Sequence, residues 1–298
     1  MSTQPIDEQH LVFGPPEWGL SLAVAVIWGS SFLWIAIAID HVASAVVPLA
    51  RCVFGVAALA LFPSARRAFR REHLPLFVGT GLIWMAVPFL LYPIAEQTVN
   101  TSITGMINGG LPVVTTIVTA GFTRTLPSRR RMLAVTVGAT GIAMISLASV
   151  GDDAGADVRG IVLLLVALVC YAVAANIARP LQTAYGALPT MLWITVFGAV
   201  WSLPLGIAGF RDSEFTWSAL GALFALGFVG TGIAFAIYGV LLHRAGPVRG
   251  MIGIFFTPVV GLLLGVSIRD DELHAIAIVG MLVVIVGAVL TSRPEPAR

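Results

Sequence analysis

Lysine is missing from this chain of 298 residues: all 17 of its basic side chains are arginine, against 15 acidic ones. Charged residues make up only 11% of the sequence, whereas a soluble domain is about one quarter charged. So few charges cannot cover a surface that faces water, and a net charge of +2 is too small to favour a nucleic-acid partner. Hydrophobic residues reach 58%, which is typical of a protein surrounded by lipid.

Cysteine and histidine are also scarce. Cys52 and Cys170 are the two cysteines, and both lie inside apolar stretches without a CxxC pattern, so a disulfide framework is not expected. The five histidines are scattered, and the sequence shows neither an HExxH motif nor a Ser-His-Asp pattern. We therefore predict no metal site, no cofactor and no enzyme, with a membrane-embedded transferase as a remote alternative.

Long apolar stretches fill most of the chain. A membrane-spanning helix needs about 20 mostly apolar residues. Ten such stretches lie near residues 18–39, 46–63, 75–96, 101–122, 132–150, 160–180, 188–210, 217–240, 249–267 and 274–292. Because none of them shows a sustained polar face, we predict an all-α integral membrane protein with ten transmembrane helices rather than a soluble helical bundle.

The arginines are distributed unevenly between these stretches. Thirteen lie on the side that would hold both termini, whereas Arg159, Arg211 and Arg269 lie on the opposite side. Cytoplasmic loops of membrane proteins carry the excess of basic residues. We therefore predict that the N and C termini are cytoplasmic, and that the chain is a multi-pass protein of the cell inner (plasma) membrane of a bacterium.

The sequence repeats one order of residues: a tyrosine, then Gly-Met-Ile, then Pro-Val-Val. This order occurs at Tyr92, 105–107 and 112–114, and again at Tyr238, 250–252 and 258–260. It predicts two halves, residues 1–150 and 151–298, of five helices each, and chance similarity between apolar segments is the alternative. An odd number of helices per half inserts the second half upside down, which gives a 5+5 inverted repeat with substrate bound where the halves meet.

Four further sequence motifs are together typical of one known protein family. They are Trp28-Gly29-Ser30-Ser31-Phe32, Arg51 with its apolar followers, the two Pro-Val-Val turns, and Gly280 with Gly287. With them the chain resembles, over nearly its whole length, the EamA-type ten-helix members of the drug/metabolite transporter superfamily. The resemblance implies a five-plus-five inverted fold with a central cavity that exports or exchanges small metabolites. Aromatic amino acid exporters are the most similar sub-group.

The chain departs from this pattern at one place. Many family members have a glutamate that ends the fourth and the ninth helix. Here Arg124-Thr125-Leu126 stands at the first position, while Asp270-Asp271-Glu272 follows the second. Any role that the family gives to the first of these acids is therefore in doubt for this chain.

Aromatic and polar side chains inside the stretches are the candidate substrate-binding residues, because polar groups at membrane depth are costly. They are Trp28, Ser31, Trp84, Tyr92, Asn108, Tyr171, Asn176, Tyr238 and Phe255. Helix packing is the alternative role for the aromatic residues, and an interhelical hydrogen bond for the two asparagines. The set predicts an amphipathic cavity for a zwitterionic or weakly charged small-molecule substrate. Together with the resemblance it implies transport of amino acids, including aromatic or apolar ones, by alternating access in the lipid bilayer, and we expect the protein to be a monomer.

Arg51 is the one charged residue well inside a stretch. One interpretation is an anchor for the carboxylate of an amino acid, since a guanidinium binds carboxylates through two N–H groups. An ion pair with Asp40 is the favoured alternative. No acid lies at a predicted midplane, because Asp40 and Glu96 stand at outer helix ends. This favours a facilitator or exchanger over the alternative, a proton-coupled exporter of cationic drugs or nucleobase-like metabolites.

Overall fold

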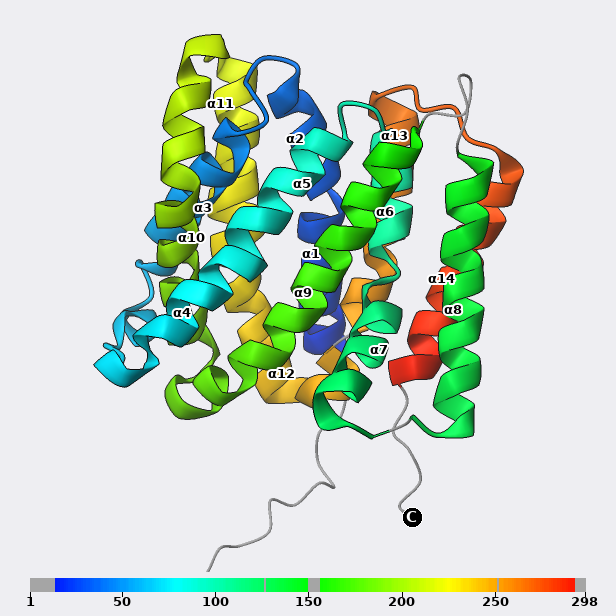
Figure 1. Ribbon diagram of the computed structural model, residues 1–298, viewed down its shortest axis with the longest axis horizontal. Coiled ribbons are helices and arrows are strands. Elements are labelled where there is room, and N and C mark those ends of the chain that lie inside the picture. The colour runs from blue at the N-terminus through cyan, green and yellow to red at the C-terminus, as the bar shows by residue number, and fades with distance from the viewer. Residues whose placement is uncertain (1–13, 126, 150–155, 251, 293–298) are drawn as a thin grey trace, which may run out of the picture.

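The computed structural model describes residues 14–125, 127–149, 156–250 and 252–292. Within these residues the chain is a bundle of helices, and its extended structure is limited to one isolated bridge between Val99 and Ala156 (Figure 1). Each of the ten apolar stretches predicted from the sequence is mainly helical over the residues that the structure describes. The prediction of an all-α protein is therefore confirmed for the part of the chain that the structure describes.

The first half of the chain forms α1 to α8. Their bounds are α1 (Pro15–Gly29), α2 (Ser31–Ile39), α3 (Val46–Leu59), α4 (Leu74–Gly81), α5 (Val87–Ala95), α6 (Thr101–Asn108), α7 (Leu111–Thr123) and α8 (Arg129–Ala148). Two short 3₁₀ turns, η2 (Pro63–Arg66) and η3 (Arg71–His73), and one π-helical segment, η4 (Leu82–Ala86), complete this half.

The second half forms α9 to α14. Their bounds are α9 (Val158–Tyr185), α10 (Ala187–Gly209), α11 (Trp217–Phe224), α12 (Ala234–Gly250), α13 (Thr257–Ile268) and α14 (Ala275–Ser292). The 3₁₀ turns η5 (Phe210–Asp212) and η7 (Ile252–Phe256) and the π-helical segment η6 (Ala225–Ile233) lie between them. The eighth predicted stretch therefore continues as helix about ten residues beyond its predicted end at residue 240.

Six helical segments among the described residues are long and apolar enough to cross a membrane, and the bent pair α6 and α7 would make a seventh. The helices Val46–Leu59, Gly253–Ile268 and Ala275–Leu290 are apolar but shorter. The multi-pass character of the protein follows from these segments. The number of ten crossings and the cytoplasmic side of the termini remain predictions.

Glycine and proline mark the places where the helices bend. The chain bends by 40° between α6 and α7, at Gly109 and Gly110, and Pro112 follows in the first turn of α7. Pro258 occupies the same position at the start of α13, directly after η7. Proline lacks a backbone N–H, so it fits the first turn of a helix better than its interior. The two Pro-Val-Val turns noted in the sequence therefore each begin a helix after a break.

The π-helical segments η4 and η6 occupy matching places in the two halves. Each follows a helix of eight residues, α4 before η4 and α11 before η6, and each continues into a further helix. Such segments are rare and are frequently found at functional sites. Both segments contact α3, and η4 packs in addition on α9 and α10.

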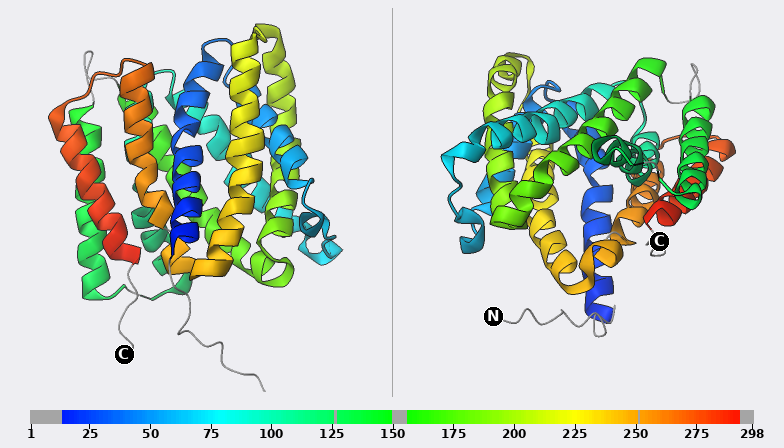
Figure 2. Two further views of the ribbon diagram at one scale, coloured as in Figure 1. Left: turned by 180° about the vertical axis from the view of Figure 1, so that it is seen from behind. Right: turned by 60° about the horizontal axis from the view of Figure 1, so that its bottom comes forward.

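The bundle has two ends. The start of α1 and the end of α14 lie at one end, which we call the inner end; α2, α5 and α13 finish at the other, the outer end (Figure 1). The pair α8 and α14 forms one edge of the bundle, and α3 and α10 lie at the opposite edge (Figure 2). Helices α1 and α9 run between these edges.

The pair α8 and α14 is held together by very close backbone contact. A Cβ atom at Gly141 would lie 2.6 Å from the Val284 nitrogen and 2.7 Å from the Gly280 oxygen. Membrane helices associate through such small residues because lipid supplies no hydrophobic driving force between them. The Gly280 and Gly287 pattern noted in the sequence therefore has a packing role at this edge.

Candidate functional site

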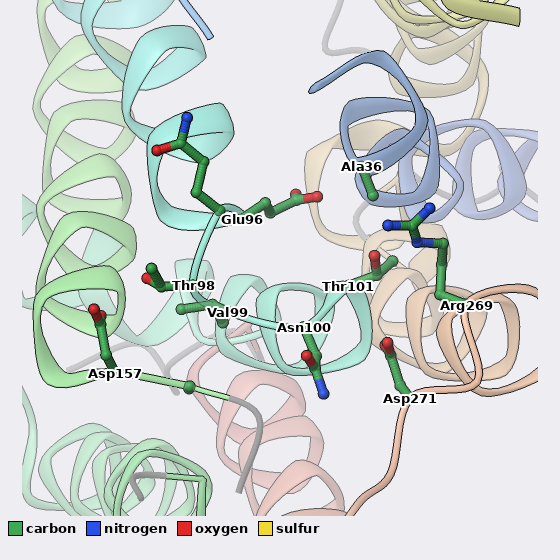
Figure 3. Close-up of a pocket in the computed structure, with 11 residues that line it drawn as sticks. Ala36, Glu96, Thr98, Val99, Asn100, Thr101, Asp157, Arg269 and Asp271 are labelled. Atoms are coloured by element: carbon green, nitrogen blue, oxygen red, sulfur yellow. The ribbon is translucent and has the colours of Figure 1, made fainter. Parts of the chain in front are cut away.

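A pocket of about 440 Å³ opens at the outer end of the bundle. Its walls come from the end of α2, the turn between α5 and α6, the residues just before α9 and the turn after α13. Glu96, Asp157, Arg269 and Asp271 supply its charged side chains (Figure 3). The pocket therefore lies where the first half of the chain meets the second.

An ion pair closes one side of this pocket. The Arg269 guanidinium donates two hydrogen bonds to Asp40, at 2.6 and 3.1 Å, so the turn after α13 is tied to the end of α2. Asp271 adds a second link, because its carboxylate accepts a hydrogen bond of 2.8 Å from the Ser102 backbone nitrogen at the start of α6. Both contacts join the two halves at the outer end.

Glu96 follows the last residue of α5, and its carboxylate is buried. Neither carboxylate oxygen has a hydrogen-bond partner among the described residues. Burial raises the pKa of this carboxyl group well above its ordinary value, and the nearby Asp271 raises it further, while Arg269 and Arg51 act in the opposite direction. Figure 3 shows the side chain pointing toward Ala36 and Arg269.

Arg51 lies deeper in the bundle, on α3, with only 8% of its surface exposed. Its Nε–H donates a hydrogen bond of 3.2 Å to the Thr231 hydroxyl on η6, and its guanidinium carbon lies 3.9 Å from the centre of the Phe89 ring. No acid among the described residues forms an ion pair with it. The expected ion pair with Asp40 is therefore wrong, because Asp40 is already bound to Arg269.

The position of Arg51 depends on a close approach between α3 and η6. A Cβ atom at Gly227 would lie 2.5 Å from the Phe54 Cβ and 2.8 Å from the Arg51 backbone oxygen. Only a residue without a side chain leaves room for this contact. The contact brings the Thr231 hydroxyl within reach of the guanidinium, so a glycine fixes the environment of the buried charge.

Tyr92, Asn108 and Tyr171 form one group of predicted site residues. The Tyr92 hydroxyl donates a hydrogen bond of 2.6 Å to the Asn108 side-chain oxygen, and its ring stacks on Tyr171 at 6.1 Å between centres. The Phe32 ring also packs against Tyr92, with 5.9 Å between the ring centres. Arg51 is near enough to Tyr92 and Tyr171 for electrostatic interaction, so this group borders the buried guanidinium.

Trp28 and Tyr238 form a second group, with their ring centres 5.2 Å apart. The indole nitrogen of Trp28 donates a hydrogen bond of 3.1 Å to the Gly230 carbonyl, and Phe235 packs edge-on at 5.8 Å. Ser31, at the start of α2, is buried and donates to the Ile27 carbonyl in the last turn of α1. This group joins α1 to η6 and α12.

Trp84, Asn176 and Phe255 are the remaining predicted site residues. Asn176 exchanges hydrogen bonds with Thr119, which links α9 to α7. Trp84 packs at the border of the hydrophobic cluster between α3, α4, α9 and α10, and Phe255 is buried in η7. Both asparagines thus make interhelical hydrogen bonds, the alternative role considered for them. None of the nine predicted residues lines the outer pocket, and their contact with a substrate stays a prediction.

Several residues of these sites had no distinct signal in the sequence. Phe89, Thr231 and Phe235 are ordinary residues of apolar stretches, and their positions beside Arg51 and Trp28 come from packing. Arg269 and Asp271 stood out only as charges in a loop. Charge alone could suggest that Arg269 pairs with an acid at the end of another helix. It does not identify Asp40 as that acid, because Asp40 lies 229 positions away in the chain.

The bundle, with apolar residues exposed along its helices and a charged pocket at one end, is that of a multi-pass membrane protein. Residues 18–147 and 158–293 match the EamA-like transporter family. The chain belongs to this family, and the resemblance noted in the sequence is confirmed. The protein is therefore a membrane transporter.

Two relatives illustrate the family. An uncharacterized transporter of Archaeoglobus fulgidus is 18% identical over 277 residues, which cover 93% of this chain and 99% of that protein. The uncharacterized inner membrane transporter YedA of Escherichia coli (strain K12) is 23% identical over 283 residues, which cover 93% and 90% of the two chains. A protein of known crystal structure has the same fold, with a TM-score of 0.62 at 16% identity over 92% of this chain and 96% of its own.

Proposed function

We propose that this chain transports small amphipathic solutes that carry a carboxylate, most of all amino acids with aromatic or apolar side chains. One observation supports the substrate class above the others. Arg51 is a buried cation that has no acidic partner in the described part of the chain, and the Phe89 ring packs against its guanidinium. A buried charge without a counter-ion is costly, so such a group usually has a functional partner.

The chemistry of the guanidinium favours a carboxylate as that partner. Arginine presents five N–H donors in a planar fork, and the described contacts use only the Nε–H, which bonds to Thr231. The remaining donors match the two oxygens of a carboxylate. The Phe89, Tyr92 and Tyr171 rings supply an apolar and aromatic surround, which suits the side chain of an aromatic or aliphatic amino acid.

The packing of the two halves supports alternating access. α1 packs against α12 and against η7 and α13, and in the same way α9 packs against α5 and α7. These are equivalent contacts if residues 1–150 and 151–298 are related by a pseudo-two-fold axis, and the matching π-helical segments agree with this relation. Transporters built from inverted repeats rock one bundle against the other around a fixed site. A chain with both halves is expected to work as a monomer in the plasma membrane.

The buried arginine argues against the alternative substrates. Cationic drugs would meet a like charge in a region of low dielectric, where repulsion is strong. Nucleobase-like metabolites lack the carboxylate that would neutralise Arg51. If Arg51 binds the carboxylate of the solute, transport should depend strongly on whether the solute carries that group.

Counterflow in proteoliposomes tests this proposal. Vesicles loaded with unlabelled phenylalanine should take up labelled phenylalanine, and the amide of the same amino acid, which has no carboxylate, should compete at least tenfold less well. A tenfold loss corresponds to about 1.4 kcal/mol, just below the about 1.5–3 kcal/mol that one hydrogen bond to a charged group contributes.

Variants of Arg51 test whether this residue causes the preference for the acid over the amide. Arg51→Gln should abolish the preference for the acid over the amide, and Arg51→Lys should restore it only in part, because an ammonium lacks the planar fork. Arg71→Gln, which removes an exposed arginine at the inner end, serves as the matched control. Equal counterflow of acid and amide by the unmodified protein would exclude the carboxylate reading.

A further inference from the structure

Glu96 is a buried acid without a partner, and it belongs to the wall of the outer pocket. Both of its carboxylate oxygens are shielded from solvent and accept no hydrogen bond from the described residues. Figure 3 shows the side chain directed toward Ala36 and Arg269, two other residues of the pocket wall. A buried polar atom without a partner is uncommon and needs an explanation. A ligand bound in the pocket would supply the missing partner.

The cation nearest to Glu96 in the pocket wall is already neutralised. Arg269 donates two hydrogen bonds to Asp40, at 2.6 and 3.1 Å. Arg51, the other arginine whose charge acts on Glu96, lies deeper in the bundle and forms no ion pair with it. The described part of the chain therefore leaves the Glu96 carboxylate without a counter-ion.

The charged side chains of the pocket wall are three acids, Glu96, Asp157 and Asp271, and one arginine. Two of these acids hold backbone nitrogens: Asp157 accepts from Gly160, and Asp271 accepts from Ser102 through its Oδ2 atom. Glu96 is the acid whose oxygens accept nothing. Since the arginine is paired with Asp40, the wall favours a ligand that carries a positive charge.

The size of the pocket and its polar groups favour an organic cation over a metal ion. The volume of about 440 Å³ lies within the about 300–1,000 Å³ that small-molecule sites occupy. Among the described residues no group of three or more His, Cys, Asp or Glu side chains could hold a metal ion. The wall also contains the side-chain oxygens of Gln97, Thr98, Asn100 and Thr101. A primary ammonium group has three N–H donors, which match such a set of oxygen acceptors.

Glu96 lies on the same side of α5 as the groups that contact Arg51. Phe89, Tyr92 and Glu96 stand at positions i, i+3 and i+7, and the Glu96 nitrogen still donates to the Tyr92 carbonyl in helical register. The Arg51 guanidinium lies on the Phe89 ring, and its charge acts on Tyr92 and Glu96. Seven residues of helix rise about 10 Å. A solute that moves between the outer end and Arg51 therefore passes Glu96.

We propose that the outer pocket is a binding site for a primary ammonium group, with Glu96 as its counter-ion, and that the amino group of the transported amino acid occupies it. The inference rests on the proposed transport function and adds recognition of the second charged group of the solute. Arg51 selects for the carboxylate, and Glu96 selects for the ammonium. A zwitterion then supplies the missing counter-charge at both residues.

The ionisation of Glu96 depends on the ligand. In the arrangement that the structure describes, burial raises the pKa of Glu96 well above its ordinary value, and Asp271 raises it further, while Arg269 and Arg51 lower it. An ammonium group beside the carboxylate favours the ionised form. The proton of Glu96 therefore passes to water in the pocket as the ammonium binds, and it returns from that water when the ligand leaves. This exchange stays on the outer side and supplies no driving force for transport.

Ammonium binding consequently has a pH dependence of definite sign. Because the bound form needs the Glu96 carboxylate, the affinity is lowest below the raised pKa of Glu96 and increases as the pH rises through it. The other titratable or charged groups of this region come from α2, α3, α5, the start of α9 and the turn after α13. They are Asp40, Arg51, Tyr92, Asp157, Arg269 and Asp271. All of them remain in Glu96→Gln, so loss of the pH dependence in this variant assigns it to Glu96.

Competition by 3-phenylpropanoate in the counterflow assay tests the inference. This compound keeps the ring and the carboxylate of phenylalanine and lacks the ammonium group. With the unmodified protein it should compete at least about tenfold less well than phenylalanine, which corresponds to about 1.4 kcal/mol. In Glu96→Gln the two compounds should compete equally. The preference of this variant for phenylalanine over its amide should persist, which shows that the variant is folded.

Two further variants serve as controls for Glu96→Gln. Glu96→Asp keeps the charge on a shorter side chain and should keep part of the preference for phenylalanine over 3-phenylpropanoate. Glu272→Gln removes an exposed outer glutamate that does not line the pocket, and it should keep the whole preference. Equal competition by both compounds with the unmodified protein would overturn the inference and leave the carboxylate proposal standing. A preference that persists in Glu96→Gln would overturn it as well.

Phenethylamine separates the two proposals, because it carries the ammonium group and no carboxylate. A ligand that binds the folded protein raises its melting temperature, which scanning fluorimetry of the purified protein measures without transport. Phenethylamine should stabilise the unmodified protein and Arg51→Gln, more strongly at mildly alkaline than at mildly acidic pH, and should not stabilise Glu96→Gln. This result without any preference for the acid over the amide would refute the carboxylate proposal alone. Absence of stabilisation in the unmodified protein, or equal stabilisation of Glu96→Gln, would refute the ammonium site.

Discussion

The Arg269 guanidinium and the Asp40 carboxylate form a two-point contact, at 2.6 and 3.1 Å, between the end of α13 and the end of α2. It connects the two halves of the chain across the outer pocket. At the inner end, Glu17 and Arg244 form a longer contact of 3.9 Å between α1 and α12. The outer contact is thus the tighter of these two links between the halves.

The energy of the outer contact suits a gate that has to open. The Arg269 and Asp40 side chains are 35% and 43% exposed, so water screens their attraction. Exposed ion pairs contribute about 0.2–1 kcal/mol. Such a pair biases the outer end toward closure without locking it.

Removal of this ion pair should open the outer pocket more often. A cysteine at position 36, which lines the pocket, would report opening by its rate of reaction with a membrane-impermeant maleimide. Asp40→Asn should raise this rate about 1.4- to 5-fold, the range that corresponds to the energy of an exposed pair. The exchanged pair Asp40→Arg with Arg269→Asp should return the rate toward the original value. No change in either variant would show that the contact does not hold the pocket closed.

Substitution of Gly141 should separate α8 from α14. Gly141→Ala would place a methyl group against the backbone of α14, at Val284 and Gly280, and backbone atoms cannot move aside as a side chain can. Overpacking of this kind costs about 1–3 kcal/mol. We therefore expect a lower melting temperature in scanning fluorimetry of the detergent-solubilised protein.

Gly79→Ala supplies the control for that experiment. Its new Cβ would meet nothing within 4 Å on α4, and alanine is the better helix former by about 1 kcal/mol. Its melting temperature should stay equal or rise. Equal melting temperatures for both variants would contradict the tight packing of α8 on α14.

Single cysteines at positions 64 and 212 should be labelled from opposite faces of the membrane. Ser64 lies in η2, in an arginine-rich inner connection, and Asp212 lies in η5 after α10; both are exposed. The background would have Cys52 and Cys170 replaced. Labelling of Ser64→Cys only after the membrane is made permeable, and of Asp212→Cys in intact cells, would support cytoplasmic termini. Labelling of both from one face would exclude the predicted inverted arrangement.

The helical segments could be located from the sequence because hydropathy is a local property. A stretch of about 20 apolar residues is recognisable without knowledge of its neighbours, and each of the ten stretches is mainly helical in the described part of the chain. The breaks before Pro112 and Pro258 were visible for the same reason, since proline acts on its own helix. Arg51 likewise stood out as a charge inside an apolar stretch.

The partners of the charged residues were not recognisable in this way. Asp40 was expected to bind Arg51 because both were assigned to the outer side, but Arg269 binds it instead. Tyr92 and Asn108 were chosen as separate cavity residues, and they are bonded to each other. Distance along the chain gave no information on either pair.

The order of apolar and basic residues thus established a helical membrane protein of a known transporter family. Only the packing of helices from both halves placed Arg51 among aromatic rings and left the Glu96 carboxyl buried without a partner. The physical reason is that burial and charge pairing depend on which helices meet. The packing of these helices depends on close contacts at glycine, such as the contact of Gly227 with α3, which join residues far apart in the chain.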